Sequence, residues 1–321
     1  MFRISEIETY FPEKKVTNED LQKEFPEWSP EKIFNKVGVK QRYTASAEET
    51  VLELAVKASE KLLKKIDKNE IDFILFCTQS PDYHLPTTAC ILQDRLGLRK
   101  NIGALDFNLG CSGFVYGLSI AKGLIATGVA QNILLVTAET YTKYLRKSDK
   151  SNRTIFGDGA AATLIQKDEA KENFQFILGT DGSGYDNLIV RNGGGRNRIN
   201  KEDEAGNCLY MNGQNIFAFT VEKIPVLVKE ILEKNNLIKN DVDYYIFHQA
   251  NAHILRRQQE ILDIPEEKFY INLEKYGNTV SSTIPIALKD ALETGKIKRG
   301  QKIMLIGFGV GLSWGATIVE L

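Results

Sequence analysis

The sequence predicts an α/β protein made of two similar halves, and three observations lead to that prediction. Short, continuous apolar runs such as 71–76 and 132–138 are typical of strands in a buried parallel sheet. Between them lie stretches with helical periodicity, and this alternation is the pattern of α/β proteins. The second half then repeats the first in the same order, which predicts a duplicated unit with a pseudo-two-fold axis.

Length and composition set the frame for this fold. The chain has 321 residues, 43% of them hydrophobic and 26% charged, with a net charge of −1. This suits two domains of about 150 residues and argues against general nucleic-acid binding. No apolar run approaches about eighteen residues, so no membrane span is expected. Four cysteines lie far apart without a Cys-x-x-Cys pair, so we expect a soluble, reduced, cytoplasmic protein with no zinc site or disulfide framework.

The first half is interpreted in chain order. Residues 1–10 alternate charged and apolar side chains, which predicts an edge-facing strand rather than a signal peptide. Residues 50–66 place apolar side chains on one helical face and lysines on the other, and the lysines are most simply a solvated face. A strand over 71–77, a helix over 88–96 and a strand over 132–138 follow.

The stretch around Cys111 carries the first chemical signal. Residues 105–107 suggest a strand, Gly110 permits a tight turn, and apolar residues from Phe114 onward recur at helical spacing. Cys111 would then begin a helix, where the dipole favours a thiolate by about 0.3–1 kcal/mol. One pKa unit corresponds to about 1.36 kcal/mol, so a nucleophile here needs a further polar partner. This stretch alone leaves open that Cys111 is only a small core residue.

The duplication predicts which residues meet Cys111. Residues 71–76 match 242–247, the spans 111–128 and 278–295 correspond, and the strands 132–136 and 302–306 follow them. His248 then takes the position of Cys77, and Asn278 takes the helix-start position of Cys111. If the two sheets pack face to face, these residues converge on one pocket, at strand ends where α/β proteins bind ligands. The Gly-rich, charged segment 180–212 is predicted to be a surface loop that could cover its mouth.

Seven ordered motifs make the chain resemble the β-ketoacyl-acyl carrier protein synthase III family of thiolase-fold condensing enzymes. The motifs are Pro81-Asp-Tyr with Leu85-Pro86, Gly110-Cys-Ser-Gly113, Phe156-Gly-Asp-Gly-Ala160, Met211-Asn-Gly213, His248-Gln-Ala-Asn251, Tyr276-Gly-Asn-Thr279, and Gly307-Phe-Gly-Val-Gly311 followed by Trp314-Gly315. The resemblance covers nearly the whole chain. It implies a five-layered αβαβα thiolase fold, with one half over residues 1–170 carrying the cysteine and another over 171–321 carrying His and Asn.

The resemblance implies that Cys111, His248 and Asn278 are catalytic. An acyl primer would be transferred from its thioester to Cys111, which divides one difficult step into two easier ones. Malonyl-acyl carrier protein would then lose CO₂, and N–H groups of His248 and Asn278 would stabilise the enolate oxygen. The enolate would attack the acyl group and give a 3-oxoacyl-acyl carrier protein. The backbone N–H groups of Cys111 and Val310 would form the second oxyanion hole, and no metal or cofactor is required.

The chain departs from the family pattern where the acyl donor binds. Lys32 and Lys150 stand at the positions of a Trp and an Arg that grip the adenine of coenzyme A, and Trp28 lies four residues earlier. Lysine lacks the planar, stacking guanidinium of arginine. We therefore expect an acyl carrier protein as the alternative primer donor. The full set of expected carrier-binding residues is Trp28, Lys32, Lys36, Lys150, Asn251, His253, Arg256 and Arg257.

Leu85 corresponds to a residue that the family inserts from one subunit into the acyl pocket of the other, so the resemblance implies a homodimer. A Leu leaves more room than the Phe often found there, and we expect primers longer than acetyl.

Three alternatives compete with the condensing enzyme. An acyltransferase on the same fold would pass the acyl group from Cys111 to a hydroxyl or amine without releasing CO₂. A non-catalytic partner subunit would typically lack the cysteine. A Cys–His hydrolase would use Asn278 to orient the histidine. The sequence also separates close relatives: 307–315 lacks the second cysteine of thiolases, and Asn278 replaces the second histidine of elongating synthases.

Overall fold

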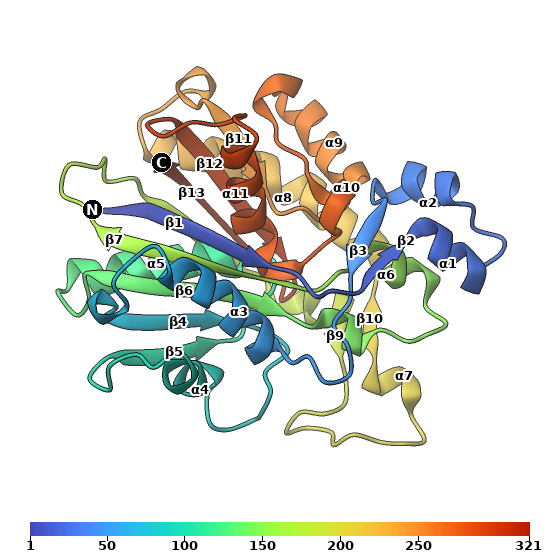
Figure 1. Cartoon of the computed structure of the whole chain (residues 1–321). Coiled ribbons are helices and arrows are strands. Elements are labelled where there is room, and N and C mark those ends of the chain that lie inside the picture. Colours follow the sequence, from blue (N-terminus) through green and yellow to red (C-terminus); the bar gives the residue numbers. More distant parts are fainter.

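The computed structural model describes all residues 1–321. Two β-sheets that face each other form the frame of the protein (Figure 1). The first sheet has the order β1 (Phe2–Tyr10), β7 (Gly159–Lys167), β6 (Asn132–Glu139), β4 (Phe73–Cys77) and β5 (Gly103–Phe107). The second has the order β11 (Tyr244–Phe247), β12 (Lys302–Gly309), β13 (Ser313–Glu320) and β8 (Phe176–Thr180).

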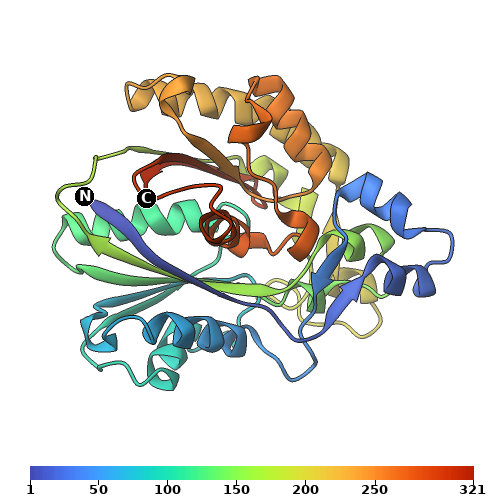
Figure 2. The same cartoon turned by 45° about the horizontal axis from the view of Figure 1, so that its top comes forward.

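Helices fill the space between the sheets and cover both outer faces (Figure 2). The helices α5 (Gly113–Ala126) and α11 (Thr283–Glu293) contact strands of both sheets. The outer face of the first sheet carries α3 (Val51–Leu63) and α4 (Thr88–Arg95), and α8 (Gly213–Lys234) covers the second sheet with α9 (Ala252–Leu262) packed against it. The predicted five-layered αβαβα fold is confirmed.

Strand alternation explains why each sheet is apolar on both faces. Ile74 and Phe76 of β4 point into the cluster under α3 and α4, whereas Leu75 points into the central cluster with α5. In β12, Leu305 faces the centre and Met304 faces the outer cluster under α8. A sheet buried on both sides needs continuous apolar strands, which is the pattern in the sequence.

The duplication is visible in the topology. The strand order β1-β7-β6-β4 of the first sheet corresponds to β8-β13-β12-β11 of the second. Only β5 lacks a full counterpart, and an isolated parallel bridge between Tyr245 and Phe269 stands in its place. We propose the division of the halves at residue 170 because the first sheet ends at Lys167 and the second begins at Phe176.

Smaller elements gather at one end of the sheets. They are β2 (Lys15–Thr17), α1 (Asn18–Glu24), α2 (Pro30–Val37), β3 (Gln41–Tyr43), α6 (Lys150–Ile155), β9 (Leu188–Val190), α7 (Glu204–Asn207), β10 (Leu209–Met211) and α10 (Leu273–Tyr276). The segment 180–212, expected to be a loop, contains the β9–β10 hairpin and α7, so that expectation was only partly right.

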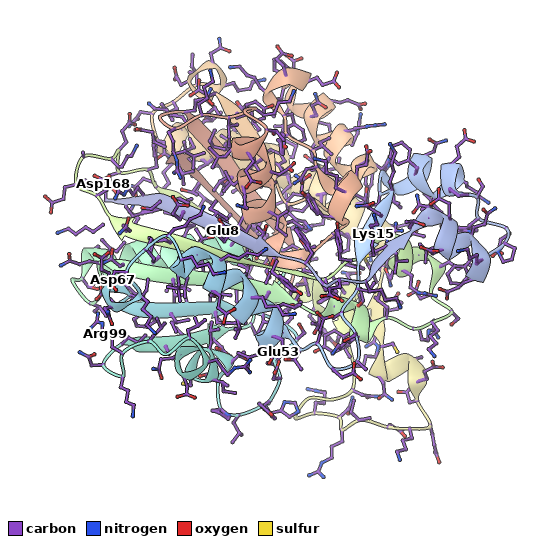
Figure 3. The ribbon with its side chains drawn as sticks, in the orientation of Figure 1. Glu8, Lys15, Glu53, Asp67, Arg99 and Asp168 are labelled. Carbon is purple, nitrogen blue, oxygen red and sulfur yellow. The ribbon has the colours of Figure 1, made fainter.

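The edge position predicted for residues 1–10 is confirmed, since β1 is the first strand of its sheet. Glu8 of β1 lies centrally in Figure 3 and forms ion pairs with Lys65 at 2.7 Å and Lys289 at 3.1 Å. Charges on an edge strand discourage pairing with another sheet. No helix of the protein is both long and apolar enough to span a bilayer.

Candidate active site

Cys111 lies in the turn between β5 and α5 and is only 5% exposed. The N–H of Gly113 donates to the carbonyl of Gly110 at 2.8 Å and closes this turn. Helix α5 begins at Gly113, so the prediction that Cys111 starts the helix was displaced by two residues. The thiol therefore sits just beyond the helix N-terminus, within reach of its positive end.

Two glycines of β12 let that strand approach the cysteine. A Cβ on Gly309 would lie 2.9 Å from both Cβ and Sγ of Cys111, and one on Gly307 would lie 2.7 Å from Cα of Ser112. Such distances are below ordinary van der Waals contact. Only glycine at these positions allows the observed packing, which explains the Gly-Phe-Gly pattern at 307–309.

The backbone N–H groups of Val310 and Cys111 donate toward Cys111 Sγ. These are the two groups expected to form an oxyanion hole. Burial nevertheless raises the pKa of the Cys111 thiol to about 12, with Glu139 adding to the rise, and the two N–H groups oppose it only in part. Burial therefore favours the neutral thiol.

A chain of hydroxyls supports the Val310 loop. Ser112 Oγ and Ser313 Oγ lie 2.7 Å apart, and Ser313 Oγ donates to the carbonyl of Val310 at 2.8 Å. With the Ser313 proton used on that carbonyl, Ser112 is the donor in the first bond. This chain ties the cysteine turn to the glycine-rich loop.

His248 follows β11 directly, as the duplication predicted, and is 2% exposed. Its backbone N–H donates to Ile306 of β12 at 2.8 Å, and its ring meets Phe308 edge-on at 5.5 Å. Burial lowers the pKa of His248 to about 3, so the imidazole is neutral at working pH. Strand β12 therefore contacts His248 at Ile306 and Cys111 at Gly309, three residues further along.

Asn278 is held by the first half of the chain. Its N–H donates to the carbonyl of Ile155 at 2.9 Å, and its own carbonyl accepts from Gly157 at 3.0 Å. The expectation that Asn278 starts a helix, as its counterpart was thought to, was wrong. A 3₁₀ turn, η6 (Val280–Ser282), comes between it and α11, which begins at Thr283.

The side chain of Asn278 is oriented by Val280. The Val280 N–H donates to Asn278 Oδ1 at 2.9 Å, so Asn278 Nδ2 points the other way, 3.5 Å from His248 Nε2 and 3.3 Å from the carbonyl of Ala250. Val280 has φ +55°, which is strained for a β-branched residue and costs on the order of 1–3 kcal/mol. The strain lies at the residue that positions Asn278.

Glu139, at the end of β6, is a buried carboxyl beside the site that the sequence analysis missed. Both oxygens accept from the Gln79 N–H at 3.1 Å, and they also accept from Ser80 Oγ at 2.9 Å and Ser281 Oγ at 3.1 Å. Burial raises its pKa to about 8. Ser281 belongs to η6, so Glu139 connects the first half to the turn after Asn278. The sequence feature that could have revealed Glu139 is an acidic residue directly after an apolar strand.

A cavity of about 410 Å³ reaches the wall behind Asn278. Its lining includes Ile155, whose carbonyl binds Asn278, and Asn251, which follows Ala250. Met211 of β10 lines another side, so the segment predicted to cover a mouth does border this cavity. Cys111, His248 and Asn278 are not among the residues that line it.

The expected carrier-binding residues gather around α2, α6 and α9, and α2 contacts both of the other helices. His253, Arg256 and Arg257 line a second cavity of about 310 Å³, with the end of α2 forming its other wall. His253 also stacks on Phe217 with 5.0 Å between ring centroids.

The lysines expected near the donor are already engaged. Nζ of Lys36 lies 4.6 Å from the centroid of the Trp28 ring, and Nζ of Lys32 lies 5.8 Å from it. Lys150 forms an ion pair with Glu27. The Trp28 ring therefore carries ammonium groups within cation–π distance.

Leu85 lies far out on the surface of the single chain and is 83% exposed. It therefore does not line a pocket of its own chain.

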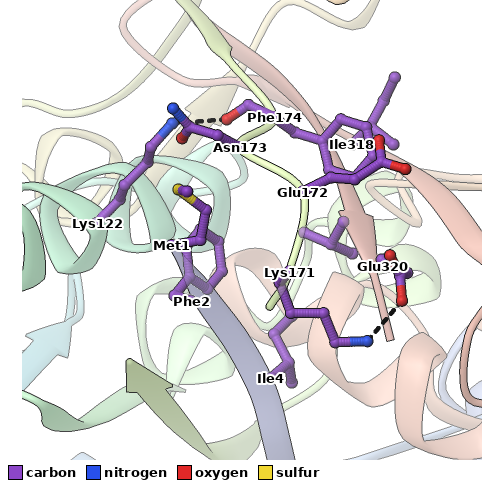
Figure 4. A pocket seen from close by; sticks show the side chains of 11 residues that line it. Met1, Phe2, Ile4, Lys122, Lys171, Glu172, Asn173, Phe174, Ile318 and Glu320 are labelled. Carbon is purple, nitrogen blue, oxygen red and sulfur yellow. Dashed lines mark hydrogen bonds and ion pairs between the residues drawn. The ribbon is translucent and has the colours of Figure 1, made fainter. Parts of the chain in front are cut away.

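The crevice in Figure 4 is unrelated to this site. It lies where the start of β1 and the end of β13 meet residues 171–174, encloses only about 10 Å³, and is bordered by an ion pair between Lys171 and Glu320 at 2.6 Å. A volume of this size holds about one water. No group of three or more His, Cys, Asp or Glu side chains is placed to hold a metal ion.

Comparison with known proteins identifies the family to which this chain is similar. Residues 105–182 match the model of 3-oxoacyl-[acyl-carrier-protein] synthase III, and residues 232–321 match the model of its C-terminal part. The chain is 39% identical to the β-ketoacyl-[acyl-carrier-protein] synthase III of Clostridioides difficile, over 98% of this chain and 96% of that protein. It is 41% identical to the Clostridium perfringens protein of the same name, over 97% of each.

Solved structures agree with this result. A 3-oxoacyl-(acyl-carrier-protein) synthase III structure superposes with a TM-score of 0.97 at 42% identity, covering 100% of this chain and 99% of that one. The corresponding protein of Pseudomonas aeruginosa superposes with a TM-score of 0.91 at 31% identity, covering 99% and 98%.

Proposed function

The chain belongs to the 3-oxoacyl-[acyl-carrier-protein] synthase III family, and we propose that it condenses an acyl primer held on Cys111 with malonyl-acyl carrier protein. The observation that carries this assignment is the arrangement around Cys111. Two backbone N–H groups point at its sulfur, and the His248 and Asn278 nitrogens lie 3.5 Å apart, near enough to share one substrate oxygen.

The first step transfers the primer. Cys111 Sγ attacks the primer thioester, the N–H groups of Cys111 and Val310 stabilise the oxyanion, and the C–S bond to the donor breaks. The thiol proton of Cys111 ends on the departing donor thiol, so charge and protons balance. One such N–H donor is worth about 2.7–4 kcal/mol.

The second step forms the carbon–carbon bond. The malonyl carboxylate leaves as CO₂, and its electron pair forms an enolate whose oxygen accepts hydrogen bonds from His248 and Asn278. The enolate carbon attacks the acyl carbonyl and expels the Cys111 thiolate, which then takes a proton from water. A neutral imidazole suits this role, because burial holds the pKa of His248 near 3.

Intact-mass measurement tests the acylation. Incubation with acyl thioesters is expected to add one acyl mass to the protein, and Cys111→Ala is expected to remove it. Cys90→Ala is the matched control, since Cys90 is an exposed free thiol. An adduct that survives Cys111→Ala would overturn the assignment of the nucleophile.

Release of CO₂ separates the condensing enzyme from the alternatives. The proposal requires one CO₂ for each 3-oxoacyl product formed from malonyl-acyl carrier protein. Acyl transfer to a hydroxyl or amine without CO₂ would favour the acyltransferase instead, and the absence of any adduct at Cys111 would favour a non-catalytic subunit. The family assignment does not favour either alternative.

For the primer donor, we propose an acyl carrier protein in place of coenzyme A. The ammonium of Lys36 lies over the Trp28 ring, and Lys150, which lacks the planar guanidinium of arginine, pairs with Glu27. Offering the same acyl group on both donors tests this. Equal or faster Cys111 acylation from acyl-coenzyme A would contradict the proposal.

We further propose a homodimer joined along β5. This strand is the edge of the first sheet, Leu105 on it is 41% exposed, and Leu85 is 83% exposed, so both are available to a second copy. Leu105→Arg is expected to give monomers in sedimentation, whereas Ile238→Arg, at another exposed apolar position, is not. In this dimer, the primer pocket of each copy would receive Leu85 from the other copy.

We also propose a cytoplasmic location, because the proposed reaction belongs to fatty acid biosynthesis.

A further inference from the structure

The hydrogen-bonding partner of the far side of His248 is Thr283, the first residue of α11. Its Oγ1 lies 2.7 Å from His248 Nδ1, and both side chains are buried, at 2% exposure each. No other group bonds to Nδ1. The imidazole orientation and its tautomer therefore depend on this one hydroxyl.

Thr283 Oγ1 has one proton and two candidate acceptors. One is His248 Nδ1, and the other is the carbonyl of Val280 at 3.0 Å. The backbone N–H of Thr283 also donates to that carbonyl at the end of η6, so the carbonyl keeps a partner when the hydroxyl turns to Nδ1. If the hydroxyl donates to Val280, Nδ1 carries the ring proton, donates to Thr283 Oγ1, and leaves Nε2 as an acceptor. If the hydroxyl donates to the nearer Nδ1, Nε2 carries the proton, and this is the arrangement that the proposed enolate donor requires.

The geometry on the Nε2 side of the His248 ring is consistent with a proton on Nε2. Asn278 Nδ2 has its orientation fixed by Val280, and it lies 3.5 Å from His248 Nε2. That separation is long for a hydrogen bond from Nδ2 to a ring lone pair. It suits two N–H donors that converge on a single oxygen placed between them.

We propose that Thr283 is a positioning residue that donates its hydroxyl proton to His248 Nδ1 and thereby holds the imidazole as the Nε2–H tautomer. This inference rests on the proposed function and deepens it, because only that tautomer can donate to the enolate oxygen. Val280 completes the device. Its N–H orients Asn278, and its carbonyl keeps the hydrogen bond from the Thr283 N–H when the Thr283 hydroxyl turns to His248.

The wild-type protein tests the tautomer without reference to activity. In ¹⁵N NMR of the protein labelled at histidine, His248 is expected to show a pyridine-like Nδ1 and a pyrrole-like Nε2 at neutral pH. His248→Gln identifies the signal. The reverse pattern, with the proton on Nδ1, would overturn the inference even in a fully active enzyme.

Variants of Thr283 test the consequence. Thr283→Val is expected to slow decarboxylation of malonyl-acyl carrier protein by about 10–100-fold, less than or similar to removing a direct oxyanion donor. Acylation of Cys111 is expected to change by less than about threefold, since it does not use His248 as a donor. Thr283→Ser keeps the hydroxyl and is expected to restore both the rate and the NMR pattern.

Thr163→Val is the matched control, because Thr163 is a fully buried threonine whose hydroxyl has no partner. If Thr283→Val slows acylation and decarboxylation equally, or if it leaves both rates and the tautomer unchanged, Thr283 does not act as proposed. A wild-type enzyme that releases no CO₂ would instead refute the proposed function. The NMR measurement would still show which nitrogen of His248 carries the proton.

Discussion

Replacement of Gly309 by alanine would press a methyl group directly against Cys111, the proposed nucleophile. The added Cβ would lie 2.9 Å from Cβ and Sγ of Cys111. Carbon atoms in good contact are about 3.5–4.0 Å apart, so Cys111 Cβ has to retreat by about 0.6–1.1 Å. Rotation of the thiol cannot relieve this clash, because the Cβ of Cys111 moves only with its backbone.

A displacement of about 1 Å in a reacting group costs about 100-fold in rate, which corresponds to about 2.7 kcal/mol of barrier. We therefore expect Gly309→Ala to slow Cys111 acylation by about 100-fold, as measured by intact mass after rapid quenching. The stability cost of overpacking is expected to be about 1–3 kcal/mol in urea unfolding.

Gly123→Ala is the matched control for this variant. Gly123 lies in α5, the helix after Cys111, and a Cβ there meets no atom within 4 Å. The control is expected to acylate normally and to gain about 0.5–1 kcal/mol of stability from helix propensity. If a folded Gly309→Ala protein acylates Cys111 at the wild-type rate, close approach of β12 is not what positions the sulfur.

Three further predictions concern stability, pH and the carrier. Asp106 of β5 accepts from the first two N–H groups of α4 at 2.5 and 2.7 Å, so Asp106→Ala should cost about 1–2 kcal/mol in urea unfolding, while exposed Asp94→Ala should cost little. Burial lowers the pKa of His248 from 6.5 to about 3, so the unfolded chain binds the extra proton. The free energy of unfolding should then fall as pH drops from about 6.5 toward 3, by up to about 1.36 kcal/mol per pH unit. His248→Asn should flatten this slope. An unchanged slope in the variant would contradict the lowered pKa of His248. Arg256→Glu with Arg257→Glu on α9 should raise the KM for malonyl-acyl carrier protein about tenfold and weaken its salt dependence, whereas Lys64→Glu, beyond the end of α3, should do neither.

Much of the fold was predictable because it depends on local periodicity. The apolar runs 71–76 and 132–138 became strands of a sheet buried on both faces, and the repeated order of elements became a repeated topology. Boundaries were less predictable. Two positions thought to start helices, Cys111 and Asn278, precede them. Cys111 lies inside the turn that Gly110 and Gly113 close, and the 3₁₀ turn beginning at the left-handed Val280 separates Asn278 from α11.

Residues that act through others were beyond the sequence analysis. The only sequence signal for Glu139 was its acidic side chain after an apolar strand, and Thr283 lies in an ordinary helix context with no signal of its own. Their partners come from segments far away in the chain: Gln79 and Ser281 for Glu139, and His248 for Thr283. A contact between distant segments is decided by packing, not by periodicity.

The sequence by itself determined the layered α/β class, the duplication, and the chemical types that come together: one thiol, one imidazole and one amide. Tertiary structure alone decided the protonation states and hydrogen-bond directions of these groups. Burial keeps Cys111 and His248 neutral, the N–H of Val280 turns the amide of Asn278, and the hydroxyl of Thr283 faces the imidazole. The physical reason is that protonation and hydrogen-bond direction depend on the dielectric and the donors around a group. Those surroundings exist only once both halves of the chain have packed together.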